Sequence, residues 1–187
     1  MEIGKLIVLT GPSGVGKGTL LRALRRRHPE LYVSISVTTR TPREGEVNGK
    51  HYYFIDRKQF DNLVAAGDLL EWAEFAGNCY GTLKSQVESH INKGDWVILE
   101  IELEGARQIK QTFPEALRIF ILPPTFDELE KRIRARGQDT EEAIFRRLER
   151  AKEEIAAAGE FDLQIVNDDL EGTLEHIEGA LFVPVGC

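Results

Sequence analysis

A run of small residues near the start of the sequence has the composition of a phosphate-binding loop. It follows an apolar, β-branched run at residues 5–10 and consists of Gly11, Pro12, Ser13, Gly14, Val15, Gly16, Lys17, Gly18 and Thr19. Glycines let backbone N–H groups converge on phosphate oxygens, the start of the next helix adds partial positive charge, and Lys17 adds a full one. The Gly-x4-Gly-Lys spacing between a strand and a helix is the P-loop pattern. It predicts nucleotide binding and disfavours an incidental glycine-rich turn.

A second group of residues could hold another phosphate. Residues 36–43 read Ser-Val-Thr-Thr-Arg-Thr-Pro-Arg, so two arginines stand three residues apart among hydroxyl side chains. Guanidinium groups bind phosphate oxygens through paired hydrogen bonds, which makes Arg40 and Arg43 candidates for this contact. Taken alone, such arginines are more often solvated surface residues, and that alternative stays open on pattern alone.

A third group, Glu71 with Tyr80 and Thr82, has the chemistry to recognise guanine. The guanine edge offers two adjacent donors, N1–H and the 2-amino group, and a carboxylate offers two acceptors at a matching separation. Adenine has an acceptor at N1 and no 2-amino group, so a buried carboxylate would reject it. Thr82 could donate to guanine O6. The competing interpretation is that Glu71 is an exposed strand residue, which is the commoner case for a lone glutamate.

The elements that must position these residues alternate between strand and helix. Strands are expected at residues 5–10, 32–37, 52–55, 96–101, 118–122 and 161–166. Helices are expected at residues 19–28, 106–111, from the Thr125 cap to about 136, 138–158 and 170–181, with a shorter one after Asp56. Such alternation implies a parallel sheet covered on both faces. The turn-rich segment 41–49 marks residues 31–83 as a small mixed β-lobe.

Composition limits the classes of partner. The 187 residues carry 24 Lys and Arg against 31 Asp and Glu, a net charge of −7, which disfavours general nucleic-acid or anionic-membrane binding. No apolar run approaches the roughly 20 residues that cross a bilayer, and no signal peptide is visible. Cys79 and Cys187 are far apart with no CxxC spacing. We therefore expect no disulfide framework or zinc site, and a reducing, cytoplasmic location.

Five segments together resemble guanylate kinase, and they cover nearly the whole chain in order. They are GPSGVGKGTL at 11–20, SVTTRTPREGEVNGKHYYF at 36–54, LEWAEFAGNCYGT at 70–82, LEIELEGARQI at 99–109 and IVNDDL at 165–170. The resemblance implies an α/β fold: a P-loop NTPase-type three-layer α/β/α core with a parallel sheet, a small mixed β-rich GMP-binding lobe and a helical lid. The chain would form a single domain, with its core at 1–31, 84–124 and 160–187, the lobe at about 32–83 and the lid at about 125–159.

The resemblance also implies roles for individual residues. The GMP phosphate would be held by Ser36, Arg40, Arg43, Tyr52 and Tyr80, and guanine would be read by Glu71 and Thr82. ATP would be bound by residues 11–19, Arg132, Arg136 and Asn167. The catalytic cations would be Lys17, Arg40, Arg43, Arg132, Arg136 and Arg147.

An acidic pair and the P-loop depart from the usual pattern of that family. The pair is commonly Asp-x-Asp or Glu-x-Asp and is Glu100 and Glu102 here. Glu100 would lie near the phosphates and Glu102 toward the guanine of GMP. The expected cofactor is Mg²⁺, with Thr19 and Glu100 as candidate ligands, in part through water. Gly18 stands where Ser or Thr is usual in a P-loop. The sequence Gly-Lys-Gly-Thr is normal in adenylate kinases, so the departure indicates a changed metal shell rather than a lost activity.

The implied reaction is ATP + GMP = ADP + GDP, with dGMP as a further acceptor, in purine nucleotide metabolism and GMP recycling. Both the lobe and the lid would close around the nucleotides. ATP and GMP are the expected partners, with no nucleic acid, membrane or obligate protein partner. Two other classes stay open: a related peptide-binding module without catalysis, and a P-loop kinase with a non-nucleotide acceptor. The intact Lys17 argues against the first, and the Glu71, Tyr80 and Thr82 set argues against the second.

Overall fold

A computed structural model describes residues 4–75, 77–137 and 139–182, so Cys187 lies outside the described residues. The chain divides into two compact units. Unit 1 comprises Met1–Val8 and Glu30–Leu117, and unit 2 comprises Leu9–Pro29 and Arg118–Cys187. The first strand contributes residues to both units.

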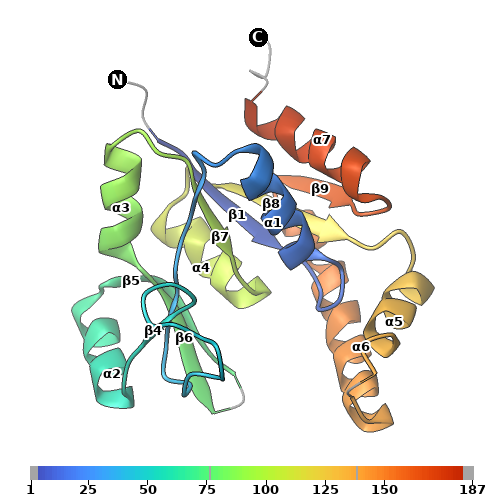
Figure 1. The fold of residues 1–187 in the computed structure, drawn as a ribbon, viewed down its shortest axis with the longest axis horizontal. Coiled ribbons are helices and arrows are strands. Elements are labelled where there is room, and N and C mark those ends of the chain that lie inside the picture. Colours follow the sequence, from blue (N-terminus) through green and yellow to red (C-terminus); the bar gives the residue numbers. More distant parts are fainter. Residues whose placement is uncertain (1–3, 76, 138, 183–187) are drawn as a thin grey trace. The chain divides into compact units, whose positions relative to one another are not determined.

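Strands and helices alternate along most of the chain (Figure 1). The strands are β1 Leu6–Thr10, β2 Tyr32–Val33, β3 Val37–Thr38, β4 Tyr53–Phe54, β5 Leu69–Phe75, β6 Asn78–Leu83, β7 Val97–Glu100, β8 Leu117–Leu122 and β9 Leu163–Val166. The helices are α1 Lys17–Arg27, α2 Arg57–Ala66, α3 Lys84–Asn92, α4 Leu103–Thr112, α5 Phe126–Arg134, α6 Glu141–Ala156 and α7 Leu170–Phe182, with a 3-10 turn, η1, at Ala158–Glu160. None of the helices in the described part of the chain has the length and apolar character that crossing a membrane demands.

A parallel sheet has the strand order β2-β7-β1-β8-β9. In unit 1, β2 pairs in parallel with β7, and Tyr32 lies opposite Val97. In unit 2, β8 pairs in parallel with β9, and Ile119 lies opposite Leu163. All five residues of β1 are buried, as expected for an apolar strand of a covered parallel sheet. The predicted α/β class with a parallel sheet and an additional mixed sheet is confirmed.

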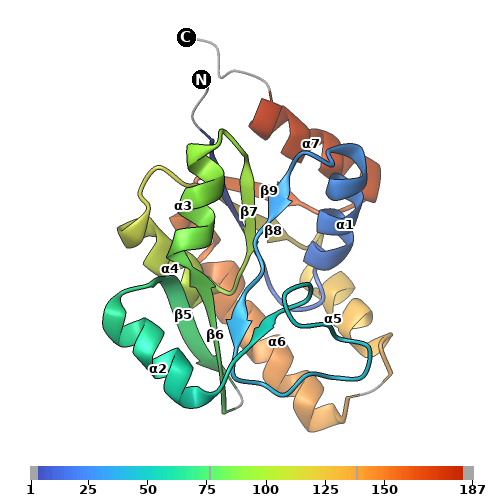
Figure 2. The ribbon, with the colours of Figure 1, turned by 60° about the vertical axis from the view of Figure 1, so that its left-hand side comes forward.

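Unit 1 contains this second sheet, with the strand order β4-β3-β6-β5. Its strands β5 and β6 are labelled in Figure 2. Strand β3 runs parallel to β4 and antiparallel to β6, and β5 and β6 form an antiparallel hairpin. One face packs on α2 through a buried cluster of Val37, Phe60 and Cys79. Asp56 fixes the start of α2, because its carboxylate accepts from the Gln59 N–H while the Gln59 side chain accepts from the Asp56 N–H. The opposite face of the sheet is left for polar side chains.

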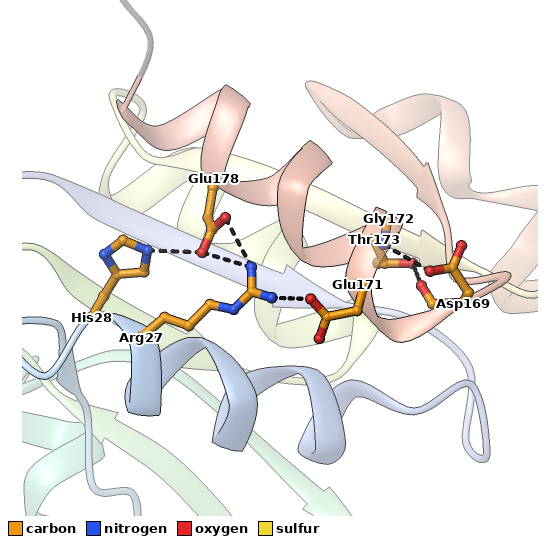
Figure 3. A network of polar contacts seen from close by, with 7 residues as sticks. All are labelled: Arg27, His28, Asp169, Glu171, Gly172, Thr173 and Glu178. Carbon is orange, nitrogen blue, oxygen red and sulfur yellow. Dashed lines mark hydrogen bonds and ion pairs between the residues drawn. The ribbon is translucent and has the colours of Figure 1, made fainter.

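In unit 2, a charged network ties α7 to the end of α1 (Figure 3). Arg27, in the last turn of α1, binds Glu171 and donates to Glu178 of α7 at 3.2 Å. The start of α7 is held by Asp169, whose carboxylate accepts from the Gly172 N–H at 2.8 Å. These contacts hold the segment between β9 and α7 in a defined place beside the helix that follows the P-loop.

The structure differs from the predicted elements in three places. The strand expected at 32–37 is divided between β2 and β3, because the chain leaves the parallel sheet there and enters the mixed sheet. Strands β5 and β6 and helix α3 occupy residues for which the sequence analysis places no separate element. Helix α6 begins at Glu141 rather than at 138, because the Thr140 hydroxyl accepts from the Ala143 N–H and caps the helix.

Candidate active site

In unit 2, the P-loop leads into α1 with the start of the helix uncapped. Gly16, the residue before α1, has a φ of 104°, and no side chain at that position caps the helix. The first N–H groups of an uncapped helix carry partial positive charge and bind phosphate oxygens. The Lys17 ammonium group donates to the Gly11 carbonyl, which keeps it at the loop. This arrangement has the donors and the charge that a phosphate group requires.

Asn167 supports the loop from the segment between β9 and α7. Its Nδ2 donates to the Val15 carbonyl at 2.8 Å, and its Oδ1 accepts from the Thr173 hydroxyl at 3.1 Å. A Cβ on Gly16 would lie 2.7 Å from Asn167 Nδ2, so both space and backbone conformation require glycine there. Asn167 therefore shapes the P-loop, and its contact with ATP stays a prediction.

Two of the three arginines predicted for the lid reach the P-loop. Arg132 of α5 donates from Nη1 to the Val15 carbonyl at 3.3 Å. Arg147 of α6 donates from Nη2 to the Ser13 hydroxyl at 2.7 Å. Arg136 lies just beyond α5 and is exposed, and the described residues include no contact of its side chain with the loop. The structure thus brings arginines from two helices to the phosphate-binding loop.

In unit 1, several of the residues predicted to bind GMP gather at one face of the mixed sheet. Side chains alternate between faces along a strand, and directly paired residues share a face. Thr38 pairs with Tyr80 and with Phe54, and Glu71 pairs with Thr82. These pairings place Glu71, Tyr80 and Thr82 on that face. Ring contacts bring Tyr52 beside Tyr80 and Arg40 beside Tyr52, and Ser36 directly precedes β3. The face lies opposite the one that packs on α2.

Arg40 is held at this face by aromatic and acidic neighbours. Its guanidinium carbon lies 5.3 Å from the centre of the Tyr52 ring, and the Tyr52 and Tyr80 ring centres are 6.1 Å apart. Arg40 Nη2 donates to the Glu46 carboxylate at 2.8 Å, and the Arg43 backbone N–H donates to the same carboxylate at 2.7 Å. These two donors lower the pKa of Glu46 to about 2, so Glu46 stays ionised and orients Arg40. Arg43 itself is exposed.

Glu71 is buried, so the interpretation of it as an exposed strand residue is wrong. The residue is 6% exposed, and Thr82 Oγ1 donates to Glu71 Oε1 at 2.7 Å. Burial raises the pKa of Glu71 to about 7, against the opposing effect of the Thr82 hydrogen bond. The carboxyl group therefore exchanges its proton much nearer to neutral pH than an exposed glutamate does, and a ligand that donates hydrogen bonds to it would favour the ionised form.

The remaining predicted residues of unit 1 lie where β7 passes into α4. Glu100 is the last residue of β7, and Glu102 is the residue before α4. Both glutamates are exposed, although Leu99 and Ile101 beside them are buried. The structure therefore places this acidic pair at a strand end, and its contacts with nucleotide or metal stay predictions.

The predicted site residues thus form two sets, one in each unit. Unit 2 holds the P-loop with Arg132, Arg147 and Asn167, and unit 1 holds the sheet-face residues and the acidic pair. Glu46 is a member of the unit 1 set to which the sequence analysis gives no role. The sequence feature that could have pointed to Glu46 is its position as an acidic residue three residues after Arg43, within a turn-rich segment.

A glycine loop that follows a buried parallel strand and opens into an uncapped helix defines the class of P-loop nucleotide-binding proteins. Comparisons with known proteins narrow the class. The family model described as guanylate kinase matches residues 3–183. The guanylate kinase of Trichormus variabilis is 69% identical over 179 residues, which cover 96% of this chain and 90% of that protein. The guanylate kinase of Trichodesmium erythraeum is 62% identical over 182 residues, which cover 97% of this chain and 98% of that protein.

A solved structure gives the same result. The crystal structure of guanylate kinase from Anaplasma phagocytophilum is similar with a TM-score of 0.76 and 35% identity, over 96% of this chain and 85% of that one. The chain belongs to the guanylate kinase family. The resemblance seen in the five sequence segments is therefore confirmed.

Glu71→Gln should stabilise the protein at alkaline pH. Because the folded pKa lies above that of an unfolded glutamate, burial costs stability progressively as pH rises from about 4.5 to about 7. A neutral amide avoids that cost, so the free energy of unfolding should increase by up to about 3 kcal/mol at pH 8 and be unchanged near pH 4. Urea unfolding followed by circular dichroism measures both values. The exposed Glu115→Gln is the control, and an equal gain for the two variants would contradict the prediction.

Proposed function

We propose that the chain divides its reaction between its units, with ATP held in unit 2 and GMP in unit 1. As a member of the guanylate kinase family it is a kinase, and its reaction is the ATP-dependent phosphorylation of GMP to GDP. The observation that carries the division of roles is the buried Glu71–Thr82 pair, which shares a sheet face with Arg40. A base-reading carboxylate and a phosphate-binding arginine on one face fit a single nucleoside monophosphate.

Guanine recognition rests on the ionised form of Glu71. Its two oxygens would accept from guanine N1–H and the 2-amino group. The Thr82 hydroxyl, which donates its one proton to Glu71 in this structure, would turn that proton to guanine O6 when the base binds. Because the carboxylate is buried, an adenine in the same place would leave its polar atoms unpaired, which is a strong basis for discrimination. Arg40, Arg43 and the two tyrosines would hold the phosphate of the same nucleotide, with Ser36 and Glu102 as further proposed contacts.

ATP binding rests on the P-loop and the lid arginines. The uncapped N–H groups of α1 and the Lys17 ammonium group supply positive charge for the β- and γ-phosphates. Arg132 and Arg147 already contact loop atoms, so small movements of their guanidinium groups would bring them onto a bound triphosphate. Arg136 is proposed as a third lid cation that reaches the nucleotide when the lid closes.

Thr19 in unit 2 and Glu100 in unit 1 each offer an oxygen donor of the kind that Mg²⁺ prefers. Thr19 Oγ1 accepts from Arg22 at 3.1 Å and keeps a second lone pair, and Glu100 supplies a carboxylate. Mg²⁺ prefers oxygen ligands and usually retains several waters beside one or two protein groups and the substrate phosphates. When bound, the ion would neutralise phosphate charge. Gly18 supplies no hydroxyl, so Thr19 in the first turn of α1 is the available one.

Phosphoryl transfer requires no covalent intermediate on the protein. A phosphate oxygen of GMP attacks the γ-phosphorus of ATP, a new P–O bond forms, and the bond to the β–γ bridging oxygen breaks, so that ADP leaves with the electron pair. The residues of the chain contribute alignment and positive charge, and closure around both nucleotides would exclude the water that otherwise hydrolyses ATP. The three-part division into core, lobe and lid, and a cytoplasmic location, belong to this proposal.

A coupled assay of ADP release tests the proposed acceptor. GMP and dGMP should support turnover, whereas AMP, UMP and a reaction without acceptor should not. Turnover with no nucleotide at all would indicate hydrolysis rather than transfer. Equal turnover with AMP and GMP would remove Glu71 from base recognition, and no turnover with any nucleotide would favour the peptide-binding class.

Lys17→Ala should lower kcat by at least about 10²-fold, since this is the scale of losing one electrostatic contact to the transferring group. Steady-state kinetics with saturating GMP measure the effect. Lys58→Ala, on the exposed surface of α2, is the matched control and should leave kcat unchanged. Near-normal turnover of the Lys17 variant would rule out the role of the P-loop.

Glu71→Gln should weaken GMP binding and remove its pH dependence. Since GMP would bind the ionised carboxylate, the wild-type KM for GMP should rise about tenfold between pH 8 and pH 6, as the group with a pKa of about 7 gains its proton. The glutamine variant should show a higher KM at pH 8 and lack this rise. Comparing the two proteins cancels the titration of the GMP phosphate itself. Parallel pH profiles would contradict the role of Glu71.

A further inference from the structure

Strand β5, which carries Glu71, lies at the edge of the mixed sheet. An edge strand has one row of backbone N–H and C=O groups without a neighbouring strand. The regular pairing of β5 with β6 also ends at Glu71, because the register shifts between Leu69 and Glu71 and the ladder is disrupted there. A base-reading carboxylate on such a strand requires another element to fix its position.

Helix α4 supplies that element through polar side chains that bond to the backbone of β5. The Gln108 Oε1 accepts from the Trp72 N–H at 2.9 Å, and the Gln108 Nε2 donates to the Trp72 carbonyl at 2.8 Å. One side-chain amide thus replaces both contacts of a missing strand. The Thr112 hydroxyl donates to the Leu70 carbonyl at 2.9 Å. Both residues adjoining Glu71 are therefore held by α4.

Gly105 is the third contact point between α4 and this strand. It is buried in the helix, and a Cβ built on it would lie 2.5 Å from Glu71 Oε2 and 3.2 Å from the carboxyl carbon of Glu71. The other carboxylate oxygen is bonded to Thr82, so the group cannot swing aside without breaking that bond. Glycine costs about 1 kcal/mol relative to alanine inside a helix. The space that it leaves is occupied by the carboxylate.

We propose that Gly105 and Gln108 are positioning residues for guanine recognition: Gln108 fixes the register of β5 beside Glu71, and Gly105 sets the depth at which the carboxylate lies. The proposal rests on the proposed function, since it concerns the same base site. Residues 105, 108 and 112 are spaced by three and four, so they lie on one face of α4. This face acts on the base only through Glu71.

Gly105→Ala is the first test. We expect KM for GMP to rise at least tenfold, with kcat within about threefold of wild type and KM for ATP unchanged, because only the base site is disturbed. Gly179→Ala in α7 is the matched control, since a Cβ there meets nothing within 4 Å. An unchanged KM for GMP in a folded Gly105 variant overturns the role of Gly105.

A double-mutant cycle with Glu71→Asp separates positioning from general disruption. The aspartate side chain is shorter by one methylene, so its carboxylate withdraws from the Cβ that alanine adds at residue 105. We expect Gly105→Ala to raise KM for GMP at least tenfold in the wild-type chain and less than threefold in the Glu71→Asp background. Effects that simply multiply would show that the two residues act independently, which overturns the proposal.

Gln108→Ala tests the register and also decides the matter if Gly105→Ala does not fold. We expect the kcat/KM ratio of GMP over inosine monophosphate, which lacks the 2-amino group, to fall at least fivefold, because a displaced carboxylate no longer meets both donors. Lys110→Ala on the exposed side of α4 is the control. An unchanged ratio overturns the role of Gln108. Wild-type protein inactive toward GMP would instead overturn the proposed function, so the two failures are distinguishable.

Discussion

The uncapped start of α1 is the constraint on which the rest of unit 2 depends. A helix that begins without a side-chain cap leaves its first N–H groups available to an anion, so the surrounding residues must hold the loop open without filling it. Gly16 adopts a positive φ, Asn167 takes up the Val15 carbonyl, and Arg132 and Arg147 approach from α5 and α6. The network between α1 and α7 holds the segment that carries Asn167. Charge, backbone conformation and helix packing in this unit therefore all contribute to the position of the P-loop.

Unit 1 meets a different physical demand, the burial of an ionisable group. Its sheet separates an apolar face, packed on α2, from a polar face that carries Glu71, Thr82 and Arg40. Burial keeps water from competing for the carboxylate, and the same burial raises its pKa and costs stability when the group is ionised. The proposed recognition of guanine by Glu71 would thus take place in an environment that disfavours the charged state of its carboxyl group.

The elements that depend on neighbouring residues could be predicted from the sequence, and the features that depend on distant residues could not. The P-loop, the short helix after Asp56 and the apolar strands depend on neighbouring residues, so their patterns were sufficient. The division of residues 32–37 between two sheets depends on partners far along the chain, since Tyr32 pairs with Val97 and Thr38 with Tyr80. The burial of Glu71 likewise requires α4, and the resemblance to a family rather than the local pattern assigned its role.

The proposed placement of base and phosphate contacts on one sheet face would have an evolutionary consequence. Reading of the base is assigned to one end of the β5–β6 pairing, whereas Arg40 and the tyrosines lie further along the same face. The register of the strands would therefore fix the distance between the residues that contact the base and those that contact the phosphate. Changes confined to the base end would retarget such an enzyme to another nucleobase while its grip on the phosphate is inherited intact. A sheet of this kind is a ready starting point for diversification among monophosphate acceptors.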